Sequence, residues 1–328
     1  MPISSIYSKR ILISPLNWGL GHVSRTIPII QKLLENKNEV YICCDQDQEL
    51  FYRQYFPELW YISHAGYPFR FRGKGEWSKD ILSNVSSLNK FLKQEELKVK
   101  DLVEKFHFDL IISDQRFGFR SKKVKSIIIS HQFNLPVSSW NVFAKFLNKR
   151  LLLKFDEIWI PDNEKNEFSG DLSRNSSKKV KYIGICSRFE MKSTKNDKKG
   201  EMEFRYLGIV SGPFPYNEQF LGDLVRKMSK TNEKCAIIAP NGLKNGEISK
   251  NGKISLYLSP NPQEFSELIQ KSEEIISRAG YTTLMDLTVL KKKAILIPTP
   301  GQQEQIYLSK LHQNRKDLTF IKDLNGGN

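Results

Sequence analysis

Residues 275–305 carry the pattern that most constrains the fold of this chain, namely a strand, a turn of small residues, a helix and a second strand in close succession. The first strand ends at Ser277, and a turn over residues 277–280 leads into a helix that begins near Tyr281. The second strand covers residues 294–297. Short apolar strands joined through a helix predict a parallel α/β sheet.

The turn and the start of this helix suit a nucleotide diphosphate. The free N–H groups and the positive dipole end of a helix N-terminus attract phosphate. Gly280 allows a close approach of the backbone because it has no Cβ. Thr282 and Thr283 can supply hydroxyl groups in the first turn, and the carboxylate of Asp286 can accept hydrogen bonds from a ribose.

A run of amides and one acid follows the second strand, in a stretch that we expect to be a loop. Ligands of open α/β sheets bind at the carboxyl ends of the strands, so these side chains could bond sugar hydroxyls. The run consists of Gln302, Gln303, Glu304 and Gln305. The alternative interpretation is an ordinary strand–helix–strand unit with a polar loop.

This stretch resembles the donor-site signature of GT-B glycosyltransferases, in particular the UDP-sugar-using group with the bacterial undecaprenyl-muramoyl-pentapeptide GlcNAc-transferase. The matching positions are Arg278, Asp286, Pro298, Glu304 and Gln305, without a gap in spacing. Asp286 stands where Glu is more usual in that group. The resemblance implies that Ser277 and the residues after it bind the donor. It also implies that the loop after the first strand of the second domain, with Ser211 and Gly212, touches the donor phosphates.

The first half of the chain begins with another strand–loop–helix unit. A strand over 10–14 precedes a Gly-rich loop over 15–22, and a helix is expected from near Val23. The loop nearly matches the dinucleotide fingerprint, with Ser24 in place of the third glycine. Its GxGH sequence ends in His22 and resembles the acceptor-side loop of the same glycosyltransferases.

That resemblance places His22 at the carboxyl end of a strand, where a near-neutral imidazole could take a proton from an acceptor hydroxyl. Asp114, directly after the apolar run 109–113, is a second candidate base. The alternative for His22 is a histidine that caps or packs at a helix start.

Further polar residues follow predicted strands and are candidates for an acceptor pocket, with ordinary loop hydrogen bonding as the alternative. The acceptor candidates are Gly19, Gly21, Arg25, Arg116, His131 and Gln132. The aromatic and basic segment 64–77 resembles the variable acceptor-facing loop of these enzymes. Its alternative is a solvated surface loop with packed aromatics.

The pattern of strands predicts two domains. Residues 1–186 form an N-terminal acceptor-side domain, the Lys-rich segment 187–200 is a linker, and 201–328 form a nucleotide-sugar-binding domain. The expected fold is therefore GT-B, with two Rossmann-like parallel-sheet α/β domains facing a cleft. A basic amphipathic helix over 139–155 could lie on an anionic membrane, or simply face the core with lysines reaching solvent.

A net charge of +15 favours anionic partners, although a Lys-rich proteome would give the same value. The basic residues are dispersed and not interleaved with aromatics, so we expect no nucleic-acid partner. The four cysteines show no CxxC spacing, which indicates neither a zinc site nor a disulfide framework. Asp45-Gln46-Asp47 is the one superficial match to a DxD metal motif and lies in the first domain, so no metal and no cofactor beyond the donor are expected.

These observations predict an inverting, metal-independent glycosyltransferase that uses a nucleotide sugar. The resemblance implies a UDP-sugar, and the acceptor is expected to be a lipid-linked sugar, a polysaccharide or a small molecule. Two alternatives stay open: a UDP-sugar 2-epimerase of the same fold, and a basic nucleic-acid-binding protein without catalysis. No apolar run is long enough to span a membrane, so we expect a cytoplasmic protein, with peripheral contact at the inner membrane face as a further option.

Overall fold

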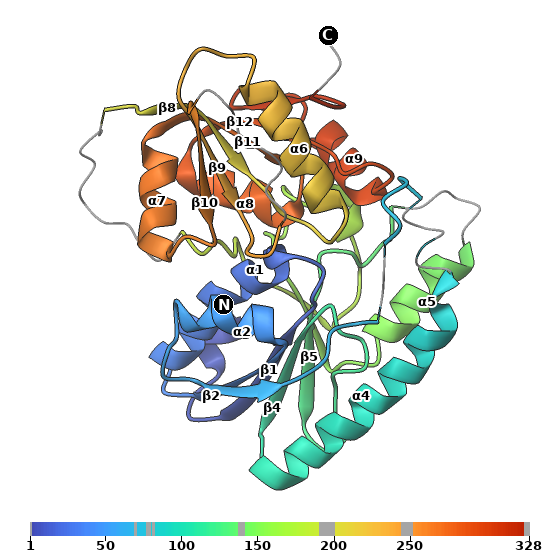
Figure 1. The fold of residues 1–328 in the computed structure, drawn as a ribbon. Coiled ribbons are helices and arrows are strands. Elements are labelled where there is room, and N and C mark those ends of the chain that lie inside the picture. The colour runs from blue at the N-terminus through green and yellow to red at the C-terminus, as the bar shows by residue number, and fades with distance from the viewer. Residues whose placement is uncertain are drawn as a thin grey trace. The chain divides into compact units, whose positions relative to one another are not determined.

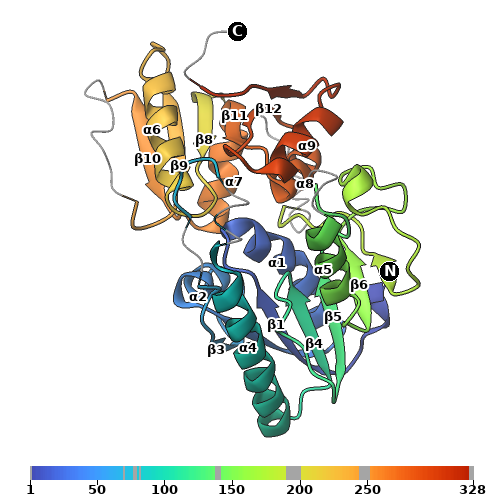
Figure 2. The same ribbon diagram turned by 90° about the vertical axis from the view of Figure 1, so that its right-hand side faces the viewer.

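The computed structural model describes residues 2–68, 71–76, 80, 83–136, 142–189, 201–243 and 252–324. The chain divides into two compact units (Figures 1 and 2). Unit 1 consists of residues Met1–Phe69 and Lys79–Glu190, and unit 2 of Arg70–Ser78 and Met191–Asn328. Unit 2 therefore includes a short segment from the first quarter of the sequence, which we call the strap and of which residues 71–76 are described. The expected linker 187–200 falls largely outside the described residues.

Unit 1 is built on a seven-stranded parallel sheet in the order β3-β2-β1-β4-β5-β6-β7. Its strands are β1 (Arg10–Pro15), β2 (Glu39–Cys44), β3 (Trp60–Ser63), β4 (Leu110–Asp114), β5 (Lys125–Ile129), β6 (Glu157–Ile160) and β7 (Val180–Tyr182). Its helices are η1 (Pro2–Ser5), α1 (Leu20–Glu35), α2 (Gln46–Arg53), α4 (Val85–Phe106), α5 (Val142–Leu152) and η2 (Gly170–Leu172).

The central strands of unit 1 are apolar on both faces, as strands covered by helices on both sides must be. Leu12 of β1 and Ile111 of β4 pack against Val99 and Val103 of α4 on one face. Successive side chains of a strand point to opposite faces, so Ile11 and Ile13, both fully buried, face the other way. This arrangement fixes the carboxyl ends of the strands, and with them the polar residues that follow.

Unit 2 repeats this plan with a six-stranded parallel sheet in the order β10-β9-β8-β11-β12-β13. Its strands are β8 (Phe204–Ile209), β9 (Cys235–Ala239), β10 (Ile254–Leu258), β11 (Ser272–Arg278), β12 (Lys293–Ile297) and β13 (Leu318–Phe320). Its helices are α6 (Tyr216–Met228), α7 (Pro262–Gln270), α8 (Tyr281–Leu290) and α9 (Gln303–Leu311). Phe220, Leu224 and Met228 of α6 pack on one face of the sheet, and Figure 2 shows α7 and α8 on the other side.

The predicted fold class, two Rossmann-like parallel-sheet domains, is confirmed. Two local expectations differ from the structure. The first long helix begins at Leu20, so Gly21 and His22 lie in its first turn and not in the preceding loop. Residues 303–305 open helix α9, where a loop was expected. Asp45 and Gln48 form the capping box of α2, so the DxD-like sequence is a helix start.

Each sheet has one topological switch point, where the strand order reverses direction. In unit 1 it lies between β1 and β4, and in unit 2 between β8 and β11. Loops that leave the two strands of a switch point turn to opposite faces and leave a crevice at the carboxyl edge, where open α/β sheets bind their ligands. The two switch points are therefore the first places to look for chemistry.

Candidate functional site

The switch point of unit 1 gathers four titratable side chains from three separate stretches of the sequence. His22 and Arg25 come from the start of α1, Asp114 ends β4, and His131 follows β5. Gly19, with a φ of 95°, precedes α1 and takes a backbone conformation that favours glycine. The parallel pairing of Pro15 with Asp114 brings the ends of β1 and β4 side by side.

Arg25 is the centre of this group. Its Nε donates to Oδ2 of Asp114 at 2.7 Å, and its Nη2 donates to Oδ1 of the same carboxylate. Its Nη1 lies 3.1 Å from Nδ1 of His131. Arg25 is 2% exposed and Asp114 is 0% exposed, so the two form a buried bidentate ion pair.

His22 is attached to this pair and is the most exposed of the four side chains, at 17%. Its Nδ1 lies 3.2 Å from Oδ1 of Asp114 and 2.9 Å from Nη2 of Arg25. A carboxylate can only accept and a guanidinium can only donate, so Nδ1 bonds one or the other according to which ring nitrogen carries the proton. In the tautomer with Nδ1–H, His22 donates to Asp114 and the lone pair of Nε2 is available to a substrate. This is the orientation that a general base requires.

The electrostatics of the group keep the imidazole neutral and the carboxylate charged. Burial and the adjacent Arg25 cation lower the pKa of His22, and they outweigh the opposing effect of Asp114. Burial alone would raise the pKa of Asp114, but Arg25 and His22 hold it at about 2. Near neutral pH the group is thus a neutral imidazole beside a compensated ion pair.

The remaining acceptor candidates do not all join this group. Arg116 is fully buried and donates from Nε to Oε1 of Glu95 at 2.6 Å, and that same oxygen lies 2.9 Å from Nε2 of His64. Gln115 between Asp114 and Arg116 has a φ of 58°, a turn that separates the directions of the two side chains. Gln132 lies beside His131, and its carbonyl accepts a hydrogen bond from Asn148 at 2.9 Å.

The switch point of unit 2 brings together the ends of β8 and β11. Ser211 and Gly212 follow β8, and Gly212 has a φ of 98° with no atom within 4 Å of the position a Cβ would occupy. Gly280 is the N-cap of α8 and makes no side-chain capping bond. The first N–H groups of a helix are the groups that attract phosphate.

Arg278, the last residue of β11, is a buried cation at this edge. It is 5% exposed, its Nη1 donates to the carbonyl of Pro298 at 3.3 Å, and its guanidinium stacks on Phe220 with 4.2 Å to the ring centre. Its Nε has no acceptor among the described residues. Burial lowers the pKa of Arg278 to about 10, so it keeps its charge at neutral pH although solvation is lost.

The other donor candidates surround this edge at different depths. Ser277 donates from its hydroxyl to the carbonyl of Ile209 at 3.3 Å and so links β11 to β8. Thr282 is buried, whereas Thr283 and Asp286 are half-buried on α8. Gln305 is buried and its Oε1 accepts from the N–H of Thr299 at 2.7 Å. Gln302, Gln303 and Glu304 are more exposed than Gln305 at the start of α9.

The strap is part of this edge, a feature that our sequence analysis did not predict. The N–H of Gly75 donates to the hydroxyl of Tyr216 at 3.1 Å, and Nε2 of Gln219 donates to the carbonyl of Gly73 at 3.2 Å. Phe71 packs edge-on against the Tyr216 ring at 6.3 Å. Two glycines two residues apart, Gly73 and Gly75, were the one sequence signal of such close packing.

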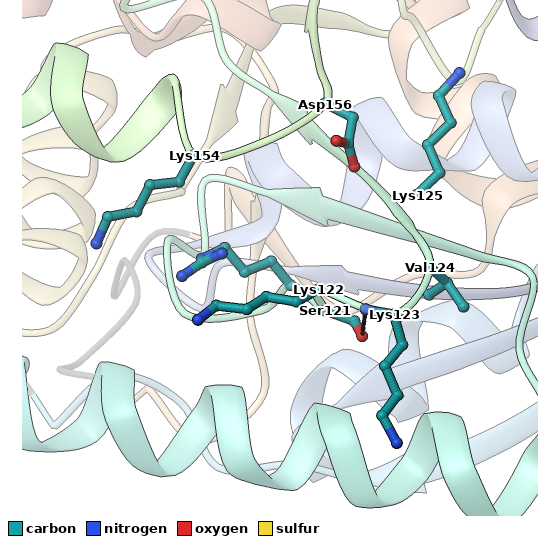
Figure 3. Close-up of a pocket in the computed structure, with 8 residues that line it drawn as sticks. Ser121, Lys122, Lys123, Val124, Lys125, Lys154 and Asp156 are labelled. Carbon is teal, nitrogen blue, oxygen red and sulfur yellow. Dashed lines mark hydrogen bonds between the residues drawn. The ribbon is translucent and has the colours of Figure 1, made fainter.

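A cavity of about 580 Å³ lies in unit 1 beside the amino end of β5, at the edge opposite the His22 group (Figure 3). Lys123 pairs with Glu104 at 2.5 Å and Lys125 with Glu157 at 2.8 Å. Figure 3 shows Lys122 and Lys154 extending toward one side of the cavity and the other two lysines extending away. Its position at the amino ends of the strands argues against a substrate site.

Comparison with known families gives one match within unit 2. Residues 216–316 match the family described as Glycosyltransferase family 28 C-terminal domain. The matched range begins at the first residue of α6 and includes β11, α8, β12 and α9. It therefore covers Arg278, Asp286 and the Gln302–Gln305 run.

Comparison with curated proteins and solved structures extends the likeness to 89–97% of the chain. A Lactobacillus gasseri protein named UDP-N-acetylglucosamine–N-acetylmuramyl-(pentapeptide) pyrophosphoryl-undecaprenol N-acetylglucosamine transferase is 22% identical over 321 residues, covering 89% of this chain and 79% of the relative. A spinosyn rhamnosyltransferase complexed with thymidine diphosphate superposes with a TM-score of 0.57 at 13% identity, covering 96% of this chain and 86% of the other. An Arabidopsis thaliana protein complexed with UDP-L-rhamnose superposes with a TM-score of 0.62 at 10% identity, covering 97% and 86%. At these identities the two structures show the shared fold.

Proposed function

We propose that this chain, a GT-B glycosyltransferase similar to family 28 that uses nucleotide sugars, takes its sugar from a UDP-sugar and transfers it with inversion to a lipid-linked acceptor. The observation that carries the proposal is the pair of switch points, one with an oriented imidazole and one with a helix N-terminus beside a buried cation. The 2-epimerase alternative is not carried forward, because the matched family and relatives are glycosyltransferases.

Unit 2 holds the donor in this proposal. The diphosphate lies on the N-terminus of α8, where Gly280 lets the backbone approach and the helix dipole favours negative charge. Arg278 adds a positive charge in a poorly solvated place, where an anion gains more than it would in water. Asp286, one turn further along α8, accepts hydrogen bonds from the ribose hydroxyls.

The same groups assist departure of the diphosphate. Negative charge grows on the leaving phosphate as the bond to the anomeric carbon breaks, and oriented N–H groups and a fixed cation stabilise that charge without reorganising. No step in this scheme requires a metal ion. We therefore propose that transfer proceeds in the presence of EDTA at the rate seen without it, and a loss of activity that Mg²⁺ or Mn²⁺ restores would contradict this point.

His22 of unit 1 is the general base. Its Nε2 takes the proton from the acceptor hydroxyl as that oxygen attacks the anomeric carbon, and one displacement inverts the configuration there. Asp114 is fully buried and cannot itself reach an acceptor, so it acts by accepting the Nδ1–H of His22. Arg25 holds the Asp114 carboxylate in place and charged.

The choice of uridine over other bases is tested by a thermal-shift panel of UDP, GDP and TDP. A ligand that binds only the folded state raises the melting temperature. We expect the largest shift from UDP, and Asp286→Asn, which keeps the side-chain shape, should weaken it. An equal shift from all three would contradict uridine specificity, and no shift with any would remove the support for a donor site in unit 2.

A lipid-linked acceptor is supported by the name of the Lactobacillus gasseri relative, a pyrophosphoryl-undecaprenol N-acetylglucosamine transferase, and by one surface of unit 1. Helix α5 exposes Val142 at 66%, Phe143 at 75% and Phe146 at 59%. Basic residues accompany this face, namely Lys145, Lys149, Arg150 and Lys154. An apolar stripe flanked by basic residues binds the surface of an anionic membrane. Among the described residues, no helix is long and apolar enough to cross a membrane.

Vesicle sedimentation tests this surface. We expect binding to phosphatidylglycerol vesicles that falls about 30-fold or more in the double variant Phe143→Ser/Phe146→Ser, because each phenyl group removed from the interface loses on the order of 1–2 kcal/mol. Leu97→Ser on α4 is the control, since Leu97 is 62% exposed in the same unit. Equal binding by the double variant and the control would contradict the role of α5.

A further inference from the structure

We propose that the strap is a donor-retaining element that spans the turn between β11 and α8, an inference that rests on the proposed function of that turn. The strap contacts two loops of unit 2. One follows β8 and leads into α6, with Pro215 in the loop and Tyr216 and Gln219 in the first turn of the helix. The other follows β12 and precedes α9, with Pro300 and Gly301.

The strand order of unit 2 shows which part of the sheet edge lies between the two contacts of the strap. In the order β8-β11-β12, strand β11 lies between the two strands whose loops the strap touches. Neighbouring strands lie about 4.8 Å apart, so the strap reaches across roughly 10 Å of the carboxyl edge. A segment fixed on both sides of β11 has to pass the turn that carries Arg278 and Gly280. It therefore forms one wall of the place assigned to the diphosphate.

The seating of the strap is tight and depends on missing Cβ atoms. A Cβ on Gly301 would overlap the carbonyl group of Gly75, and a Cβ on Gly73 would lie 2.5 Å from Cγ of Pro215. Gly73 and Gly75 have φ values of 73° and 72°, in the left-handed region that favours glycine. Phe71 is 7% exposed, so its ring anchors one end of the strap on Tyr216.

Two exposed basic residues of the strap allow its detachment from unit 2 to be measured by trypsin cleavage. Arg72 and Lys74 have exposed side chains, and each is followed by one of the strap glycines. Trypsin cleaves after Arg and Lys only where the backbone can detach from its packing contacts and become extended. The rate of cleavage at Arg72–Gly73 and Lys74–Gly75 therefore measures how often the strap leaves the two loops.

The test compares Gly301→Ala with Gly242→Ala. Gly301 has a φ of 77° and Gly242 a φ of 82°, so both alanines suffer the same backbone strain. Nothing lies within 4 Å of a Cβ at Gly242, whereas at Gly301 the Cβ displaces the strap. In full-length protein, we expect Gly301→Ala to raise strap cleavage and the Kd for UDP each by about tenfold, as loss of a few ordered contacts would. Gly242→Ala should change neither.

UDP itself should slow strap cleavage in the unaltered protein, because a strap that helps to hold the donor is held by it in return. If Gly301→Ala is too unstable to purify, Tyr216→Phe replaces it. That variant keeps the ring against Phe71 but removes the hydroxyl that accepts from Gly75, and we expect changes of about threefold in the same direction.

The outcomes separate the strap from the proposed function. If the unaltered protein binds UDP but Gly301→Ala and Gly242→Ala behave alike, the strap proposal fails and the donor site stands. Faster cleavage in Gly301→Ala with an unchanged Kd for UDP also overturns it, because the strap would then be structural only. Absence of UDP binding in the unaltered protein overturns the proposed donor site.

Discussion

The two switch points of this protein occupy the same place in two similar sheets, yet their buried charges are stabilised in different ways. At β1/β4 of unit 1, charged side chains satisfy one another: Arg25 and Asp114 form a buried bidentate pair, and His22 is held against it. At β8/β11 of unit 2, the buried Arg278 donates to the carbonyl of Pro298 and stacks on the ring of Phe220. The first arrangement fixes a side chain in position, whereas the second favours an anion that comes from outside.

The ion pair of unit 1 should therefore matter most for the stability of the fold, and the buried cation of unit 2 for the binding of a ligand. Breaking a compensated buried ion pair leaves an unpaired charge and destabilises the fold. Replacing the buried cation of Arg278 by an apolar side chain relieves a desolvation cost instead. Equivalent substitutions at the two switch points should therefore have opposite consequences, and the following predictions test that comparison in order of decreasing effect.

The largest effect is expected for Asp114→Asn. The substitution keeps the shape of the side chain but leaves Arg25, which is 2% exposed, without its counter-charge. We expect a loss of about 3–5 kcal/mol in the free energy of unfolding, measured by urea denaturation. Asp286→Asn serves as the matched control in unit 2, where a half-buried carboxylate is changed in the same way. A loss below about 1 kcal/mol at Asp114 would show that the pair does not organise unit 1.

The next effect is on catalysis and concerns His22. His22→Gln should lower kcat by about 10²–10⁴, the range for loss of a general base. The thermal shift caused by UDP should stay unchanged, because the donor is assigned to unit 2. Steady-state transfer assays measure kcat, and a thermal-shift assay with UDP on the same preparation measures donor binding. A variant with undiminished kcat would remove His22 from the mechanism.

The substitution Arg278→Met tests the role of the buried cation at the switch point of unit 2. We expect the Kd for UDP to rise about 10- to 100-fold, as loss of about 1.5–3 kcal/mol from an ionic hydrogen bond implies. The melting temperature without ligand should stay the same or rise, since the variant no longer buries a poorly solvated cation. Calorimetry with and without UDP measures both quantities. A destabilised variant with normal UDP affinity would mean that Arg278 is a structural residue.

The smallest predicted effect is a pH dependence. The fold lowers the pKa of His22 below its usual 6.5, so the imidazole is neutral and competent above that value. kcat should be flat from pH 6.5 upward and should fall as the pH drops toward the lowered pKa. Stability follows the same direction, because below pH 6.5 the unfolded chain takes up a proton that the folded protein resists. In the unaltered protein, a kcat that still rises with pH above pH 7 would contradict this assignment.

Much of the fold could be predicted from the sequence because the buried strands are short continuous apolar runs. The strands predicted over 10–14 and 294–297 lie within β1 (Arg10–Pro15) and β12 (Lys293–Ile297). Helix α9 was missed because Gln and Glu after Gly301 are as common in loops as in the first turn of a helix. Strand β13 was also missed, since three residues carry too little pattern to recognise.

The site could be predicted only in part, because strand ends give positions but not side-chain directions. Arg25 and Arg116 were assigned to the same acceptor pocket, yet Arg25 contacts Asp114 and Arg116 contacts Glu95. The strap was not predicted because its hydrogen bond from Gly75 to Tyr216 joins residues 141 positions apart. Such contacts follow from the packing of the folded chain and leave no periodic signal in the sequence.

Amide hydrogen exchange of the full-length protein, with and without UDP, tests the division of roles most directly. The account predicts new protection at the β8–α6 loop, the start of α8 and the strap, with no change at the start of α1 or the end of β4. Protection that appears around His22 and Asp114, while the β11–α8 turn exchanges as before, would contradict it.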